Sequence, residues 1–235
     1  MSSEPVIDLR ADDQLRRMTD YLKGLDRLRF EVDVTYDDYL VDDELVQKHR
    51  RSTVEALRPD RLRGSAASDD DERAYWFDGS RLTFLDRRNN VYSEVAVAGS
   101  IDTLIETLAD KYDVVNPVME FLSTDAYRWL MGNVSDAEYV GEVTLAGEKC
   151  HHLAYRQPTL DWQIWISAGD AALPRKLVIR YKQLTGYPQY QAVFSSWDTA
   201  PNFSAADFAA QVPADAGRVE FQPQARAVGS GTKPQ

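Results

Sequence analysis

The residues best suited to chemistry are Cys150, His151 and His152, which follow one another directly in the sequence. Thiolate and imidazole groups are common zinc ligands, but a metal site needs three or four of them converging in space. Neighbouring residues of a β-strand point to opposite faces, so His151 and His152 are not expected to share one ion. We therefore predict no metal site here, and we expect Cys150 to behave as a small buried apolar side chain.

Other catalytic patterns are missing from the sequence. It contains no Gly-x-Ser-x-Gly elbow, no His-Glu-x-x-His motif and no glycine-rich phosphate loop after a strand. The acidic run Asp69 to Glu72 is expected in a loop, because its like charges need solvent. We predict no catalytic residue and no cofactor, and a hydrolase is the third and least supported hypothesis.

Composition excludes one broad class of partner. The 235 residues carry a formal net charge of −11, whereas nucleic-acid binders usually present a basic face. One stretch is basic, and we expect its side chains on solvated strand faces and turns: Lys48, Arg50, Arg51, Arg58, Arg61 and Arg63. No apolar run is long enough to span a membrane, and the single cysteine allows no disulfide within the chain.

Alternating patterns predict that strands dominate the chain. A helix with Leu15, Met18 and Leu22 on one face comes first, followed from Leu28 by a strand that alternates apolar and polar residues. Asp78-Gly79 suits a tight hairpin turn. Further strands are expected at 46–57, 61–65, 75–77, 82–85, 91–97, 139–145, 151–155, 162–166, 177–181 and 190–194. Short local connections of this kind indicate an antiparallel sheet.

The middle of the chain is predicted to be helical. An apolar stripe runs from Ile101 to Leu108, and Ser100 before it is a suitable N-cap. Asn116-Pro117 predicts the start of a second short helix, and Tyr127 to Met131 a third that ends at Gly132. These helices are apolar and aromatic, so another part of the protein must cover them.

Several motifs resemble a known family. They are Asp161-Trp162-Gln163-Ile164-Trp165-Ile166, Leu173-Pro174-Arg175-Lys176-Leu177-Val178-Ile179, Pro188-Gln189-Tyr190 through Phe194 to Trp197-Asp198, Arg58 to Arg63, and Met18 to Leu25. With the order helix, strands, central helices, strands, the chain resembles a bacterial family of predicted periplasmic proteins in the LolA/LolB-like lipoprotein-carrier superfamily. The resemblance covers roughly residues 11–221.

The resemblance implies an α+β fold, mainly antiparallel β, in which a strongly curved half-barrel sheet carries an N-terminal helix. Short central helices are expected to plug its concave face. Residues 11–221 are expected to form a single domain between a flexible N-terminus, 1–10, and a flexible tail, 222–235. The resemblance also implies a periplasmic or secreted protein whose leader is absent from the sequence. If Met1 is the true start, the protein is expected in the cytoplasm.

Twelve residues are candidates for contact with an apolar ligand on this concave face. They are Phe30, Val32, Val34, Leu104, Phe121, Trp129, Trp162, Ile164, Leu177, Ile179, Tyr190 and Phe194. On a flat or closed sheet the same side chains are simply core. On an open half-barrel they line a surface that the central helices either seal or leave open for a ligand.

Two functional hypotheses follow, one for a concave face that is open to a ligand and one for a concave face that is sealed. In the first, a non-enzymatic envelope protein binds or carries a lipid, an acyl chain or a lipoprotein anchor under a lid of short helices. In the second, the cavity is filled by the protein's own side chains, and the scaffold is an interaction or envelope-sensing module. The sheet edges or the Arg58 to Arg63 region then contact an envelope protein partner.

Overall fold

The computed structural model describes residues 6–40 and 44–222. One group of strands precedes the central helices: β1 (Val6–Ile7), β2 (Arg27–Tyr39), β3 (Leu45–Leu57), β4 (Arg61–Ala67), β5 (Glu72–Phe77), β6 (Arg81–Asp86) and β7 (Val91–Ala96). The other follows them: β8 (Asp136–Leu145), β9 (Glu148–Arg156), β10 (Leu160–Ser167), β11 (Pro174–Tyr181), β12 (Gln189–Asp198) and β13 (Gly217–Arg218). The helices are α1 (Leu9–Lys23), α2 (Ile101–Tyr112), α3 (Pro117–Glu120), α4 (Ala126–Met131) and the short 3-10 helix η2 (Ala205–Phe208).

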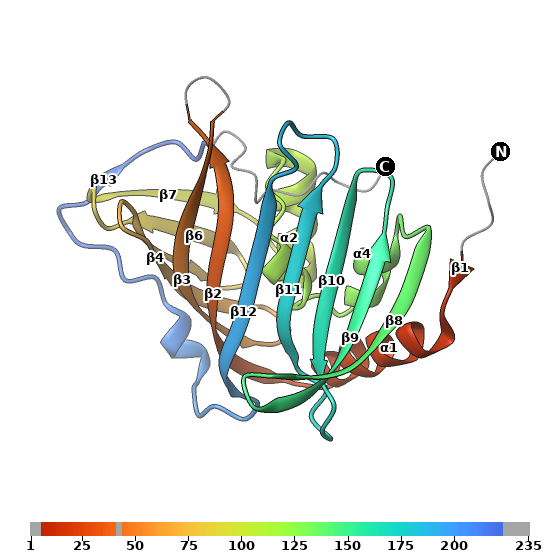
Figure 1. Ribbon diagram of the computed structural model, residues 1–235. Coiled ribbons are helices and arrows are strands. Elements are labelled where there is room, and N and C mark those ends of the chain that lie inside the picture. The colour runs from red at the N-terminus through yellow and green to blue at the C-terminus, as the bar shows by residue number, and fades with distance from the viewer. Residues whose placement is uncertain (1–5, 41–43, 223–235) are drawn as a thin grey trace.

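In the described part of the chain, these strands form one open, curved sheet of 13 strands. Their order is β1-β8-β9-β10-β11-β12-β2-β3-β4-β5-β6-β7-β13, and the two terminal strands lie at opposite edges (Figure 1). Neighbours are antiparallel except at the edges, where β1 runs parallel to β8 and β13 parallel to β7. The prediction of a mainly antiparallel half-barrel is confirmed.

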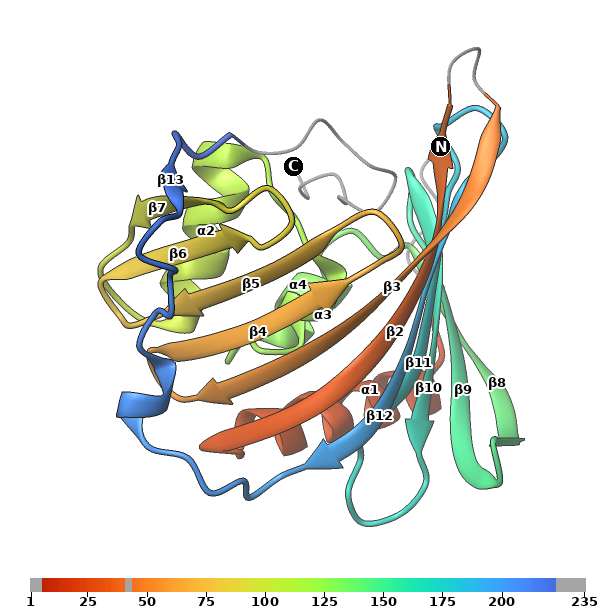
Figure 2. The same cartoon turned by 90° about the vertical axis from the view of Figure 1, so that its left-hand side faces the viewer.

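The sheet consists of two meanders that join at its centre. β2 to β7 form one meander and β8 to β12 the other, and β12 pairs with β2 through partners such as Phe194 and Val32. Figure 2 shows the sheet turning sharply at this junction, so that its two halves face each other across a hollow. This non-local pairing builds the concave face from strands that are far apart in the sequence.

Alternation along β2 shows why one face of the sheet becomes the core. Phe30 and Val32 are fully buried, whereas Arg29 between Leu28 and Phe30 is exposed. Side chains alternate between the two faces of a strand, so one face packs inward and the other meets solvent. Burial of each large apolar side chain contributes about 1.5–3 kcal/mol.

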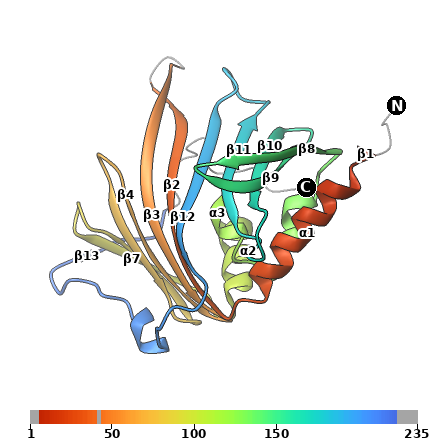
Figure 3. The ribbon, with the colours of Figure 1, turned by 60° about the horizontal axis from the view of Figure 1, so that its bottom comes forward.

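Helix α1 covers the β8–β10 half of the concave side (Figure 3). It begins at Leu9, because the Asp8 side chain caps it by accepting from the Arg10 amide at 2.8 Å. Residues 6–10 thus comprise β1, the N-cap Asp8 and the start of α1, so regular structure begins before residue 11. Residues 1–5 and 223–235 lie outside the described residues.

Helices α2, α3 and α4 form a helical cap inside the hollow (Figures 1 and 2). Ser100 is the N-cap of α2, and its Oγ accepts from the Thr103 amide at 3.2 Å, as the sequence predicted. Asn116, directly before Pro117, caps α3: its side-chain oxygen accepts from the Val118 amide at 3.0 Å. Among the described helices, none combines the length and apolar character needed to cross a membrane.

A segment after β12 wraps around the outer face of the sheet. Phe208 of η2 is fully buried, and the guanidinium of Arg63 on β4 lies 5.3 Å from the centre of its ring. Farther along, Val212 and Ala216 pack on a small second core formed by Ala74, Trp76 and Leu85. This segment leads into β13 at the sheet edge. The sequence patterns predicted neither the segment's path nor β13.

Candidate functional site

The strands bring the nine sheet residues predicted for ligand contact onto one concave surface. Register pairs show how they adjoin: Trp162 lies opposite Ile179, Ile164 opposite Leu177, and Tyr190 opposite Ile179. Phe194 of β12 pairs with Val32 of β2 and joins the two halves of the surface. The sheet therefore presents a continuous apolar and aromatic face toward the cap.

The remaining three candidates come from the cap. Leu104 lies on the buried side of α2, Phe121 ends α3, and Trp129 lies on α4. The Phe121 ring meets Phe194 edge to face, with 5.5 Å between the ring centroids. All twelve candidates except Trp129 are buried, so in this arrangement the cap and the sheet form one packed core.

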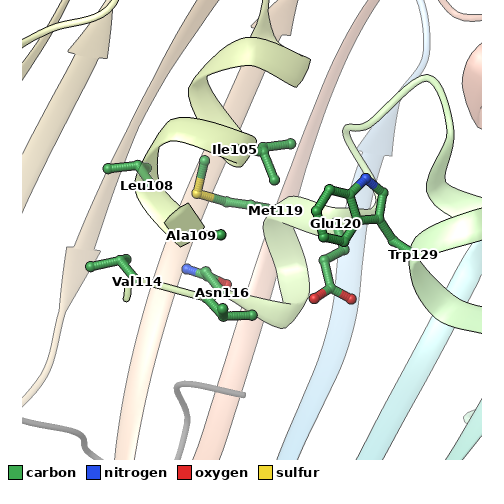
Figure 4. A pocket seen from close by; sticks show the side chains of 9 residues that line it. Ile105, Leu108, Ala109, Val114, Asn116, Met119, Glu120 and Trp129 are labelled. Carbon is green, nitrogen blue, oxygen red and sulfur yellow. The ribbon is translucent and has the colours of Figure 1, made fainter. Parts of the chain in front are cut away.

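A pocket remains where the end of α2 meets α3 and α4 (Figure 4). Its lining is Ile105, Leu108, Ala109, Val114, Val115, Asn116, Met119, Glu120 and Trp129. The enclosed space holds little more than one water molecule. Trp129 alone belongs to both this lining and the twelve predicted residues. The apolar spacing of Ile105, Leu108 and Ala109 was a signal in the sequence, but nothing there indicated that this side of the helix would line a pocket.

Glu120 is the charged residue of this pocket, and Figure 4 shows its side chain beside Trp129. No ion pair or hydrogen bond to its carboxylate occurs among residues 6–40 and 44–222. Burial disfavours the ionised form and raises the pKa of Glu120 to about 7. Sequence reasoning missed this residue, because a single glutamate in a short helix carries no distinguishing pattern.

Two polar groups of the concave face also lack partners in the described part of the chain. They are the indole N–H of Trp162 and the hydroxyl of Tyr181, and both side chains are buried. Native proteins pair the great majority of such groups. Burial, followed by the nearby Glu120 carboxylate, raises the pKa of Tyr181. The apolar concave face therefore contains unpaired polar atoms, and one of them, the Tyr181 hydroxyl, lies near Glu120 of the pocket.

The Cys150-His151-His152 run forms no joint site. The imidazole of His151 lies 2.9 Å from the Tyr139 hydroxyl, whereas that of His152 lies 2.9 Å from the Gln163 side-chain oxygen and stacks on Trp165. Cys150 is fully buried, and burial raises the pKa of its thiol. No group of three or more metal-ligating side chains converges among the residues that the structure describes.

The side chains of the basic stretch between residues 48 and 63 form ion pairs and hydrogen bonds with other residues of the protein. Its members pair with nearby carboxylates: Lys48 with Asp38, Arg50 with Asp71, Arg51 with Asp33, Arg61 with Asp60 and Arg63 with Glu55. Arg58 instead donates to the main-chain oxygens of Leu25 and Leu122. Arg58 thus ties the β3–β4 turn to the end of α1 and to the cap.

Comparison with solved structures shows the same fold in distant proteins. The Mycobacterium tuberculosis lipoprotein LppX is 14% identical with a TM-score of 0.53, over 83% of this chain and 98% of that one. An uncharacterized conserved protein from Thermus thermophilus is 12% identical with a TM-score of 0.51, over 90% and 99%. LprF from Mycobacterium bovis is 18% identical with a TM-score of 0.47, over 92% and 100%. At such identities the similarities to LppX and to the Thermus thermophilus protein show the fold alone, and the one to LprF, with a TM-score below 0.5, adds nothing to that argument.

A search of curated proteins finds no match. A family described as "Predicted periplasmic protein (DUF2092)" matches residues 11–222, nearly all of the described fold. This agrees with the resemblance found in the sequence, which covered roughly residues 11–221. The chain belongs to the DUF2092 family of predicted periplasmic proteins.

Proposed function

We propose that this protein binds an apolar ligand, such as a lipid, an acyl chain or a lipoprotein anchor, inside its half-barrel. The observation that carries the proposal is the apolar pocket between α2, α3 and Trp129, in the cap that covers the concave face (Figure 2). Ligand pockets are typically concave and apolar, with a few polar groups that orient the ligand. In this proposal the pocket is the entrance, and it widens when the cap shifts.

Movement of the cap is needed because the predicted ligand contacts are packed in the present arrangement. Phe121 is 1% exposed and Phe194 is 4% exposed, so an alkyl chain reaches them only by displacing cap side chains. A bound chain replaces those contacts and gains about 0.8 kcal/mol for each buried CH₂ group. The long sheet stays in place while the short helices, joined by loops, move.

Binding in the cell envelope without catalysis is the second part of the proposal. The family description as predicted periplasmic supports the location, and LppX, which has the same fold, is a lipoprotein. The buried Cys150 thiol has a raised pKa, which disfavours the reactive thiolate. A non-enzymatic carrier or binder needs only the apolar pocket and the apolar concave face, and no catalytic group.

Uptake of diphenylhexatriene, which fluoresces in an apolar environment, tests the proposal. The Ala109→Phe variant fills the pocket and is expected to lower the rate or extent of uptake about tenfold. Ala96→Phe is the matched control, because Ala96 is exposed at the end of β7. Thermal unfolding checks that both variants are folded. Equal uptake by folded Ala109→Phe and the wild type would contradict entry through this pocket.

An exposed apolar rim supports the alternative, a partner-binding module. Leu40 is 50% exposed, Leu184 41% and Tyr187 54%. Their two loops adjoin, because the Tyr39 hydroxyl donates to the Thr185 carbonyl at 2.6 Å. For this function we expect Leu184→Ser to abolish capture of an envelope protein while leaving probe uptake unchanged. Unchanged capture of that partner would argue against the rim.

A further inference from the structure

Three buried polar side chains surround Ile179 on the concave face. Trp162 of β10 lies opposite Ile179 on one side, and Tyr190 of β12 lies opposite it on the other. Tyr181 is two residues farther along β11 and therefore points to the same face. Trp162 is 4% exposed, and Tyr181 and Tyr190 are each 6% exposed. Their polar atoms thus lie in an interior that is otherwise apolar.

Glu120 approaches these side chains from the cap. Its carboxylate acts on both tyrosines: after burial, it helps to raise the pKa of Tyr181, and it adds to the rise at Tyr190. Glu120 also lines the pocket, so the two tyrosines on which it acts lie near that lining, and Trp162 adjoins them across Ile179. We call Glu120, Trp162, Tyr181 and Tyr190 the Glu120 cluster.

The Glu120 cluster has unused hydrogen-bonding capacity of a definite kind. The Trp162 indole can only donate, the Tyr181 hydroxyl can donate or accept, and an ionised Glu120 can only accept. Neither the Trp162 nitrogen nor the Tyr181 oxygen has a partner among the described residues. A ligand group that both donates and accepts satisfies donor and acceptor atoms together.

We propose that the Glu120 cluster binds the hydroxyl group of a neutral amphipathic lipid, such as a long-chain alcohol or an acylglycerol. This inference rests on the proposed function, since the alkyl chain of that lipid occupies the half-barrel. The hydroxyl donates to Glu120 and accepts from Tyr181, so the buried tyrosine oxygen that is now unpaired gains a partner. Pairing such atoms strengthens binding more than a solvent-exposed hydrogen bond does.

Charge favours a neutral group over an anionic one. No lysine or arginine lines the pocket, whereas Glu120 brings a carboxylate to it. The cation that acts on Tyr190 is Arg50, which faces Asp71 at 3.8 Å. A fatty-acid carboxylate or a phosphate placed in the cluster therefore meets Glu120 with no free cation from residues 6–40 and 44–222 beside it, and like charges repel.

Competition with bound diphenylhexatriene tests this inference. Dodecanol, dodecyl methyl ether and dodecanoate share one alkyl chain, but only the alcohol both donates and accepts as a neutral molecule. We expect dodecanol to displace the probe at about one tenth of the concentration needed for the ether or the anion. Tyr181→Phe removes one unpaired hydroxyl and is expected to abolish most of this preference, whereas Tyr187→Phe, at an exposed tyrosine, keeps it.

The outcomes separate the inference from the proposed function. Equal displacement by alcohol and ether, or a preference that survives in Tyr181→Phe, overturns the Glu120 cluster as the binding site and leaves apolar binding standing. Failure of the wild type to take up the probe overturns both. Thermal unfolding of Tyr181→Phe is expected to match or exceed that of the wild type, because the variant removes an unpaired buried group.

Discussion

Titration of Glu120 links the stability of the folded protein to pH. Its pKa of about 7 lies above its ordinary value of 4.5, so the unfolded chain releases this proton at lower pH than the folded protein does. This contribution to stability therefore decreases as pH rises from about 4.5 to about 7, and the penalty persists above that range. A carboxylate that is kept at this cost fits a role in ligand binding.

Glu120→Gln is expected to remove this penalty. Above pH 7 the variant should be more stable than the wild type by about 2 kcal/mol, because an amide carries no charge to bury. Below pH 4 the two proteins should be nearly equal. Urea unfolding at several pH values measures the difference, and Glu106→Gln on the exposed side of α2 is the control. The same difference at pH 4 and pH 8 would refute the assignment.

Individual residues were predicted from the sequence with unequal success. Opposite directions for His151 and His152 followed from strand geometry, and the structure gives them separate partners, Tyr139 and Gln163. Glu120 and Tyr181 were not singled out, since their significance depends on what surrounds them rather than on their type or spacing. A buried polar atom without a partner can be recognised only once the tertiary packing is known.

At the scale of elements, the cap is held together by Asp102 of α2. Its carboxylate accepts from the Ser123 hydroxyl at 2.8 Å, and from the amide and the hydroxyl of Thr124 at 2.8 and 2.9 Å. These bonds connect α2 to the loop between α3 and α4, so the three short helices are linked as one unit. A unit linked in this way is suited to shift as a whole over the concave face.

Asp102→Ala is expected to loosen this unit. Loss of the three bonds should lower the free energy of unfolding by about 1–3 kcal/mol and increase the rate of diphenylhexatriene uptake. Glu106→Ala, on the exposed side of the same helix, is the matched control. Stopped-flow fluorescence measures the rate. Slower or unchanged uptake by a destabilised Asp102→Ala variant would show that the cap does not control entry.

Most elements were predictable because their signals are local. Ser100 and Asn116 act as helix caps as predicted, and the alternation in β2, β10 and β11 matches their burial. The two-residue edge strands β1 and β13 are too short to carry a period. The wrap across the outer face is stabilised by scattered contacts such as that of Phe208, which leave no pattern in the sequence.

At the scale of the whole molecule, the pairing of β12 with β2 creates the concave surface. Hydrophobic alternation predicted the members of this surface but not their order in the sheet, and the family resemblance supplied only the half-barrel shape. Neither could show that the cap seals most of the surface and leaves a pocket beside Trp129, because that depends on how the side chains fill the hollow.

Native mass spectrometry of the protein purified gently from its own host, with lipid analysis of an organic extract, tests the central claim most directly. The account predicts an adduct that survives purification, is released by organic solvent and contains an alkyl or acyl chain. A bare protein mass, together with no uptake of diphenylhexatriene by the folded protein, would contradict it. The concave face would then be a closed core.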